Sequence, residues 1–483
     1  MEAGLPADLP RLTRDRPAPP AGVVHLGVGA FFKAFGAIWL EDAMAASGGA
    51  WGVIGVSLRR PDERDKLAPQ GYAYQAVELG PEGRQIRKVQ VLRDILVAPE
   101  DPQAVLAAMV DPEIRIVSLT VTEKGYTHSP ATGRLDVAHP DVVHDLGRAD
   151  APRSAIGFLV RALDRRRQTG MRPFTVLCCD NLPANGRMLR GLVLEFAERV
   201  DPALAAWIAA EVRFPSTMVD RIVPATTPAD IERLAEETGL RDEGAVFHEP
   251  FRQWAVEDDF IDGARPDFGV VGAQLTSEVE PFELMKLRCL NGTHSALAYL
   301  GYLSGHETVA DAVADPVLAA FIERLWRAEI VPSLAPPEGM DLSSYTDALR
   351  TRYANPAIRH RTWQIAMDGS QKLPQRILGT VADNLAAGRP VTGLATVVAA
   401  WMRYVGGTDG AGRPIDVRDP LADRLRALSD GAGDAEARAD ALLSVREVFP
   451  EALAADPRFR ASVARSLGSI EVRGARSTLE TLT

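Results

Sequence analysis

Cysteine is scarce in this sequence, and long apolar runs are missing. The 483 residues include three cysteines, Cys178, Cys179 and Cys289. Adjacent cysteines rarely bridge each other and the count is odd, which suits a reducing cytoplasm and predicts three small buried residues. Their spacing fits no zinc template, and the sequence shows no cluster of histidine and cysteine ligands, so we expect no metal site.

Membranes and nucleic acids are disfavoured as partners. No apolar run approaches the roughly 20 residues that span a bilayer, and residues 1–20 lack the apolar centre of a secretory signal. The formal net charge of −11 disfavours nucleic acid and anionic membrane surfaces. We therefore expect a cytoplasmic protein, for which monomer and homodimer fit equally well.

The first half of the chain predicts an α/β fold with a doubly wound parallel sheet. It contains several short, nearly continuous apolar runs. Such runs are typical of strands buried on both faces, as in parallel sheets that are covered by helices. Strands are predicted at residues 22–29, 51–57, 114–122 and 174–179, and helices at 31–46 and 154–168.

Helices dominate the second half of the chain. They are predicted at residues 282–304, 315–329, 343–353 and 391–404. Glycine and proline interrupt regular structure between residues 270 and 281, where we place the main boundary. The predicted organisation is a flexible lead-in (1–20), an α/β domain (21–277) and a mainly helical domain (278–483).

A glycine-rich turn follows the first predicted strand. Gly27 and Gly29 occupy the first two glycine positions of a dinucleotide-binding turn, where one permits the turn and the other lets the backbone approach a pyrophosphate. Phe32 stands where the third glycine belongs, so an ordinary tight strand-to-helix turn is the alternative. Phe31 and Phe32 are expected to lie near a bound cofactor.

Charged residues after the second strand bear on the choice of cofactor. Asp62 can hold the ribose hydroxyls of an adenosine, which selects NAD. Arg59 and Arg60 could instead meet the 2′-phosphate of NADP, or form an ordinary solvated strand end. NAD is the favoured prediction.

Polar side chains also follow the third and fourth strands, at the edge where doubly wound sheets bind their ligands. Glu123 could relay a proton or fix a donor, and Lys124 adds a positive charge beside it. Asn181 is placed to donate to a substrate oxygen. Asp180 and Asn185 could simply cap the next helix.

The segment from Met285 to Ser295 is the most informative in the chain. Lys286, Asn291 and His294 fall at about 0°, 140° and 80° around a regular helix, so they can line one side of it. A lysine that is costly to bury as a cation suits proton transfer, and an amide can donate to a developing oxyanion. A buried helix with three satisfied polar residues is the alternative.

Residues 355–376 are dense in side chains that bind anions. In an acidic protein such a stretch favours a small acidic substrate as partner. A salt-bridged, solvated helix is the alternative, and the stretch by itself favours it slightly.

These pieces together resemble the mannitol dehydrogenase family of long-chain, metal-independent polyol dehydrogenases. The most specific similarities are residues 214–224, which look like the family signature, and the segment with Lys286, Asn291 and His294. The resemblance runs from about Val23 to near the C-terminus. It implies a Rossmann-type domain and a helical domain, with the site in the cleft between them.

The resemblance also assigns roles to individual residues. Lys286 would be the general acid and base, Asn181 and Asn291 the pair that stabilises the oxyanion, and His294 a group that binds substrate or positions the lysine. Asp220 would support the site. The positions that match the family's cofactor residues are Gly27, Gly29 and Asp62, and the implied cofactor is NAD.

Within the family, the chain most resembles members that interconvert D-fructuronate and D-mannonate. At least one extra cationic group would then pair with the carboxylate of the sugar acid. The candidates are Lys124, Arg252, Arg288, His360 and Arg361. The alternatives are a polyol 2-dehydrogenase for mannitol or arabinitol, and a nucleotide-binding regulatory protein that has lost catalysis.

One stretch departs from the family pattern. Members usually have Phe-His-Arg-Ala-His after the glycine turn, whereas this chain has Phe31, Phe32, Lys33, Ala34 and Phe35. The stretch is expected near the cofactor phosphates or the substrate pocket, so the change could mark a sister activity on another sugar acid or polyol.

Overall fold

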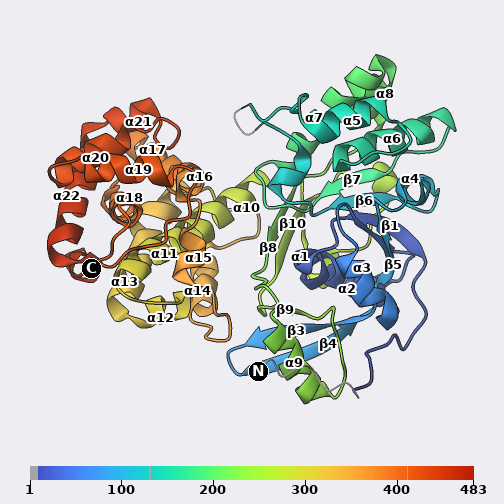
Figure 1. Cartoon of the computed structure of the whole chain (residues 1–483), viewed down its shortest axis with the longest axis horizontal. Coiled ribbons are helices and arrows are strands. Elements are labelled where there is room, and N and C mark those ends of the chain that lie inside the picture. The colour runs from blue at the N-terminus through green and yellow to red at the C-terminus, as the bar shows by residue number, and fades with distance from the viewer. Residues whose placement is uncertain (1–8, 130–131, 411, 483) are drawn as a thin grey trace. The chain divides into compact units, whose positions relative to one another are not determined.

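The computed structural model describes residues 9–129, 132–410 and 412–482. The chain forms two compact units, Met1–Glu280 and Pro281–Thr483 (Figure 1). The division lies three residues beyond the boundary that the sequence predicted. Within the described ranges, no helix combines the length and the apolar character needed to cross a membrane.

The first unit is built on a five-stranded parallel sheet with the order β5-β2-β1-β6-β7. This is the doubly wound arrangement predicted from the sequence, and its order reverses between β1 and β6, where such sheets bind ligands. The sequence analysis missed β5. The strands are β1 (Ala21–Leu26), β2 (Gly52–Ser57), β5 (Leu92–Val97), β6 (Ile116–Leu119) and β7 (Thr175–Cys178).

Both faces of this sheet are buried. Val24 and Leu26 of β1 face the core that contains α4, α6 and α7, and Figure 1 shows α6 and α7 beside β6 and β7. Val23 faces the opposite core, which includes side chains of α1, α2 and β10. The helices of the unit are α1 (Ala30–Ala34), α2 (Gly36–Ser47), α3 (Asp62–Leu67), α4 (Pro102–Val110), α5 (Pro140–Gly147), α6 (Ala155–Gln168), α7 (Asn185–Val200), α8 (Pro202–Glu211) and α9 (Pro228–Thr238).

Two three-stranded sheets complete the first unit, with the orders β4-β3-β9 and β11-β10-β8. Their strands are β3 (Tyr74–Gly80), β4 (Gly83–Val89), β8 (Thr217–Asp220), β9 (Val246–His248), β10 (Gln253–Glu257) and β11 (Gln274–Thr276). The sequence analysis predicted no strand in these segments, which mix polar with apolar residues.

The described part of the predicted flexible lead-in is held against the first unit. Leu12 is 1% exposed, and its N–H donates to the carbonyl of Arg241 at 2.9 Å. Arg14 donates to the carbonyl of Gly71, also at 2.9 Å. The prediction of a loose segment is therefore wrong for residues 9–20, and for residues 1–8 it lies outside the described part of the chain.

The second unit is mainly helical, and its described residues contain no β-strand. Its central helices α11 and α18 are buried along most of their lengths and pack against each other. The α-helices are α10 (Glu280–Met285, beginning at the last residue of the first unit), α11 (Thr293–Leu303), α12 (Val309–Ala314), α13 (Pro316–Leu325), α14 (Leu342–Tyr353), α15 (Thr362–Ala366), α16 (Gly369–Leu373), α17 (Gly379–Ala386), α18 (Thr392–Val405), α19 (Ala422–Asp430), α20 (Ala435–Leu443), α21 (Glu451–Ala455), α22 (Pro457–Arg473) and α23 (Ala475–Glu480).

Three π-helical turns interrupt these helices. They are η5 (Lys286–Gly292), η6 (Trp326–Ile330) and η8 (Pro374–Leu378), and η5 packs against both of the others. The sequence predicted one regular helix over residues 282–304, whereas η5 separates α10 from α11. Such wide turns occur frequently at functional sites.

Candidate functional site

The turn after β1 has the geometry of a nucleotide-binding turn. Gly27 has φ +95°, and a Cβ there would lie 2.2 Å from the carbonyl oxygen of Thr120, so only glycine fits. A Cβ on Gly29 would find one atom within 4 Å, at 4.0 Å, so the space beside Gly29 is open. These two glycines fit the close approach of a dinucleotide pyrophosphate.

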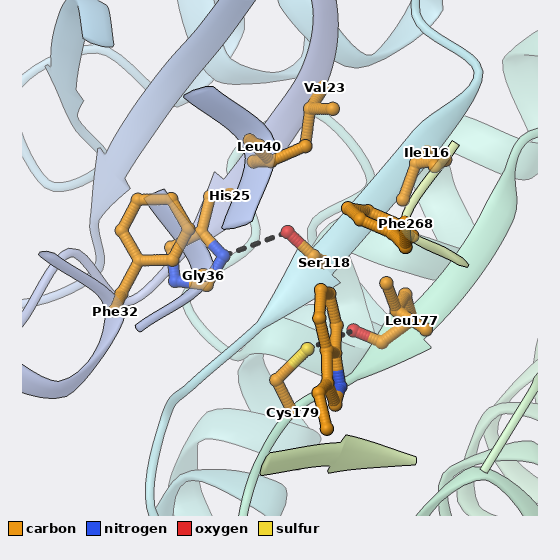
Figure 2. Close-up of a pocket in the computed structure, with 11 residues that line it drawn as sticks. Val23, His25, Phe32, Gly36, Leu40, Ile116, Ser118, Leu177, Cys179 and Phe268 are labelled. Atoms are coloured by element: carbon orange, nitrogen blue, oxygen red, sulfur yellow. Dashed lines mark hydrogen bonds between the residues drawn. The ribbon is translucent and has the colours of Figure 1, made fainter. Parts of the chain in front are cut away.

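A buried histidine is linked to this turn through hydrogen bonds. His25 contacts Ser118 Oγ through Nδ1 at 2.8 Å (Figure 2). Its Nε2 contacts Thr120 Oγ1 at 2.9 Å. Thr120 Oγ1 donates to the carbonyl of Gly27 at 2.8 Å, so the network assigns the proton of His25 to Nε2. Burial lowers the pKa of His25 to about 3, and the ring is therefore neutral.

Phe32, at the position of the third glycine, points into the core. Its ring stacks on His25 with centroids 3.5 Å apart, and Figure 2 shows both rings in one pocket. Phe35 is buried against Trp39 and Trp254. Phe31, which is partly exposed, stacks on Phe35 at 5.1 Å.

The lysine of the same stretch is also internal. Lys33 is buried and donates to Glu63 Oε2 at 2.6 Å and to the carbonyl of Gly244 at 3.0 Å. Phe32, Lys33 and Phe35 therefore replace the family's histidines and arginine with groups that pack inside the first unit. The ring of Phe32 packs on His25, and its predicted place near a bound cofactor stays a prediction.

The end of β2 leaves an acidic side chain accessible. The carboxylate of Asp62, at the first residue of α3, is 49% exposed and lies 3.2 Å from Arg60. Arg59 is paired with Asp141 at 2.7 Å. Both arginines that could meet a 2′-phosphate are thus paired with a carboxylate, Arg59 with Asp141 and Arg60 with Asp62.

The ends of β6 and β7 are tied together by Asp180. Its carboxylate accepts from the backbone N–H of Val121 at 2.8 Å and from Tyr126 Oη at 2.6 Å. Burial raises the pKa of Asp180. Glu123 and Lys124, in the 3₁₀ turn η2 (Glu123–Tyr126) that this carboxylate holds, are both exposed.

Of the two asparagines that follow β7, Asn185 is buried and Asn181 is exposed. Asn185 donates to the carbonyl of Thr217 at 2.9 Å, which is a structural role. Asn181 is exposed and makes contacts of its own. It is the residue of this loop that a ligand can reach.

The signature segment, residues 214–224, links the layers of the first unit. Thr217 Oγ1 donates to the carbonyl of Cys178 at 2.7 Å, and Arg221 Nη1 donates to the carbonyl of Ala34 at 2.7 Å. Burial lowers the pKa of Arg221 to about 10. Asp220 is 3% exposed. These contacts join β7, β8 and α1, so the signature describes a structural junction.

In the second unit, the π-helical turn changes how Lys286 and Asn291 are related. A π-helix bonds residue i to residue i+5, so Asn291 lies one turn along from Lys286, on the same face. The 140° separation predicted for a regular helix is therefore wrong. Lys286 is 8% exposed, and Asn291 is partly exposed.

Side chains from other helices satisfy the carbonyls of this wide turn. The carbonyl of Cys289 accepts from Thr293 Oγ1 at 2.5 Å and from Trp326 Nε1 at 2.9 Å. The carbonyl of Leu290 accepts from Tyr353 Oη at 2.9 Å. Because buried carbonyls need partners, these contacts stabilise η5 in place of ordinary helical bonds.

His294 lies among aromatic and cationic groups. Its ring centroid is 4.8 Å from that of Tyr353 and 5.3 Å from that of His360. Burial, followed by the charges of His360, Arg376, Arg352 and Lys286, lowers its pKa well below the ordinary value. His294 is therefore a neutral hydrogen-bonding group at physiological pH.

Three further basic groups, His360, Lys372 and Arg376, extend this cluster. Burial, with the charges of Lys372 and Arg376, lowers the pKa of His360 to about 4. Lys372 donates to the carbonyl of Met367 at 2.6 Å, and burial lowers its pKa to about 8. Arg376 donates to Ser295 Oγ at 3.3 Å.

Of the cationic residues predicted to hold a carboxylate, only His360 belongs to this cluster. Arg288 is paired with Asp383 at 2.6 Å, and Arg252 with Asp42 at 2.6 Å, while Arg252 also stacks on Trp39. Arg361 is 56% exposed and lies 3.5 Å from Glu307. Each of these three arginines therefore has an acidic partner within the protein, and the substrate-binding roles predicted for them stay predictions.

Arg376 and Lys372 were not selected from the sequence. They lie in the basic stretch of residues 355–376, whose density was noticed, but no local signal separates them from their neighbours. The structure selects them because they reach His294 and His360.

Each unit thus supplies one part of a redox enzyme. The first has a doubly wound sheet with a glycine turn at the reversal of strand order, and the second has a buried lysine beside an amide and a neutral histidine. This combination defines a two-unit dehydrogenase.

Comparison with known proteins agrees with this class. The family models for the mannitol dehydrogenase Rossmann domain and C-terminal domain match residues 21–269 and 278–471. The chain belongs to the mannitol dehydrogenase family and is an oxidoreductase.

Individual relatives cover nearly the whole chain. It is 45% identical to "Uncharacterized oxidoreductase YeiQ" of Escherichia coli (strain K12) over 96% of this chain and 95% of that protein. It is 44% identical to the D-mannonate oxidoreductase of the same organism, over 95% of each. The Pseudomonas fluorescens mannitol 2-dehydrogenase, solved with NAD and D-mannitol, is similar with a TM-score of 0.84 and 37% identity, over 99% of this chain and 97% of that one.

Proposed function

We propose that this protein is an NAD-dependent oxidoreductase that interconverts D-fructuronate and D-mannonate. The observation that carries the proposal is the group of cationic side chains, Lys286, Lys372 and Arg376, around the neutral imidazoles of His294 and His360. In a chain with a net charge of −11, such a cluster favours an anionic substrate. The 44% identity with a D-mannonate oxidoreductase supports the same substrate.

The first unit would hold the cofactor. Gly27 and Gly29 would admit the pyrophosphate, and the exposed carboxylate of Asp62 would accept hydrogen bonds from the ribose hydroxyls. NAD is preferred over NADP because Asp62 would repel a 2′-phosphate and Arg59 is held by Asp141. When bound, the nicotinamide accepts or returns a hydride.

Lys286 would move the proton. In the direction of oxidation, its neutral amine accepts the proton of the C5 hydroxyl while the hydride leaves C5, and the product is the ketone. In reduction, the ammonium returns the proton to the C5 oxygen. Its position at the start of η5, 8% exposed, limits competition from bulk water.

Amide and imidazole groups would orient the substrate. The amide of Asn291 donates to the C5 oxygen as negative charge develops there, and the same role stays a prediction for Asn181. His294 stays neutral, because burial keeps its pKa low, so it contributes hydrogen bonds and no charge. Through these bonds it would bind a substrate hydroxyl or position Lys286.

The test is NADH oxidation by the purified protein with D-fructuronate or D-fructose under identical conditions. We expect a strong preference for D-fructuronate, and loss of turnover in Lys286→Ala with NADH binding retained. Equal loss of NADH binding in that variant would contradict the role given to Lys286.

Two alternatives predict other results. The similarity to a mannitol 2-dehydrogenase supports a polyol 2-dehydrogenase, which would prefer D-fructose. A regulatory protein that had lost catalysis would bind NADH, and its Lys286→Ala variant would keep full function in the cell.

A further inference from the structure

We propose that Arg376 binds the carboxylate of the substrate and thereby selects a sugar acid over a neutral ketose. This inference rests on the proposed function. It assigns the carboxylate contact to a residue that the sequence analysis did not select.

The backbone holds Arg376 beside the catalytic segment. It lies in η8, which packs against η5. The two turns touch at Gly292, where a Cβ would lie 2.9 Å from the carbonyl oxygen of Arg376. The side chain reaches Ser295, the residue after His294, through a bond of 3.3 Å from Nη1 to Oγ.

The guanidinium has donors to spare. It carries five N–H groups, and in the described part of the chain its one hydrogen bond is the long contact with Ser295. No carboxylate among the described residues forms an ion pair with it, unlike Arg288 with Asp383 and Arg252 with Asp42. A half-buried guanidinium without an anionic partner raises the free energy of the folded protein because its charge is partly desolvated. An anionic ligand would offset that penalty.

The surroundings of Arg376 suit a carboxylate better than its neighbours do. Lys372 already donates to the carbonyls of Ile365 and Met367. The planar guanidinium can grip both carboxylate oxygens, whereas an ammonium offers a single charge. The charge of Arg376 also contributes to the low pKa of both His294 and His360, behind burial in each case, so it acts on both rings.

The position also fits the shape of the substrate. In the proposed sugar acid, three carbons separate the carboxylate from the reacting C5. The carboxylate should therefore lie some distance from the amine of Lys286 and not at it. Ser295 follows Lys286 by nine residues, about two and a half turns of a regular helix.

The experiment compares Arg376→Gln, Arg376→Lys and wild type, with NADH and either D-fructuronate or D-fructose. We expect Arg376→Gln to lower kcat/KM for D-fructuronate about 100-fold, mainly through KM, because a charge-assisted pair is lost in ground and transition states alike. Activity with D-fructose should change less than about 3-fold. The kcat/KM of Arg376→Lys for D-fructuronate should lie between those of the wild type and Arg376→Gln, since lysine keeps the positive charge but cannot bind a carboxylate with two parallel hydrogen bonds.

Arg350→Gln is the matched control, because Arg350 is 59% exposed on α14 and pairs with Glu323 at 3.0 Å. Thermal midpoints and NADH binding of every variant report folding. Equal losses on both substrates in Arg376→Gln and Arg376→Lys, with wild type still preferring D-fructuronate, would overturn the inference and leave the proposed function intact. Preference of wild type for D-fructose would overturn the proposed function itself, and the inference with it.

Discussion

Gly292 offers a direct test of how the catalytic turn is held. Its backbone is right-handed helical, with φ −63° and ψ −50°, so alanine suits the conformation. The added Cβ would lie 2.9 Å from the carbonyl oxygen of Arg376, a backbone atom that cannot swing away. Gly292→Ala must therefore push η5 and η8 apart.

The size of the effect follows from two opposing contributions. Alanine in a helix gains about 1 kcal/mol over glycine, while overpacking costs about 1–3 kcal/mol. Gly379→Ala is the control, because Gly379 is also helical and a Cβ there would meet nothing within 4 Å. The control should show the gain alone, so the two thermal midpoints should differ by about 2–12 °C.

The kinetic consequence should be larger than the change in stability. Displacing Arg376 and Lys286 by a fraction of an ångström should lower kcat/KM for D-fructuronate by about 10-fold or more. NADH binding, assigned to the first unit, should be unchanged. The measurements are thermal unfolding, steady-state kinetics and NADH fluorescence titration of both alanine variants. Identical midpoints and identical kcat/KM in the two variants would refute the close contact of η5 with η8.

Three further predictions concern the first unit. Gly27→Ala should abolish NADH binding in a fluorescence titration, because φ is +95° and the Cβ would lie 2.2 Å from the carbonyl oxygen of Thr120; binding at wild-type strength would contradict the turn geometry. The pKa of His25 is about 3 in the folded protein and about 6.5 when unfolded, so the unfolded chain binds the extra proton between these values and stability falls as pH drops from 6.5. His25→Gln should reduce the slope of unfolding free energy against pH by up to about 1.4 kcal/mol per pH unit below pH 6, and an unchanged slope would rule out a buried neutral imidazole. Asp62→Ala should lower the preference for NADH over NADPH by about 10-fold, as an accessible carboxylate that repels the 2′-phosphate is removed; an unchanged ratio of the two kcat/KM values would exclude this role.

Much of the large sheet was readable from the sequence because four of its strands are buried on both faces. Short continuous apolar runs such as residues 174–179 are typical of strands in a parallel sheet that is covered on both faces. Strand β5 (Leu92–Val97) was missed because Arg93 and Asp94 break its apolar pattern. Its place in the sheet comes from pairing with β2, which is a tertiary property.

The π-helical turn could not be predicted, although its residues were recognised. Local sequence favours a regular helix over residues 282–304. The wide turn depends on Trp326 and Tyr353, which bond the carbonyls of Cys289 and Leu290 from other helices. No periodicity in the segment itself encodes those partners.

The cationic residues show the same limit for the site. Arg288 lies two residues from Lys286 and was expected to bind substrate, but Asp383, 95 residues away, holds it. Arg376 looks ordinary in the sequence, and the structure distinguishes it by its place beside Ser295 together with the lack of a carboxylate partner among the described residues. Which cation is available depends on its neighbours in space.

A competition assay tests the central claim most directly. D-fructuronate and D-fructose at equal concentration would share one reaction with limiting NADH, and the amounts of D-mannonate and D-mannitol formed would give the ratio of the two kcat/KM values. The cationic cluster around His294 predicts D-mannonate in excess of about 100-fold. D-mannitol as the main product would contradict the account and establish a polyol 2-dehydrogenase.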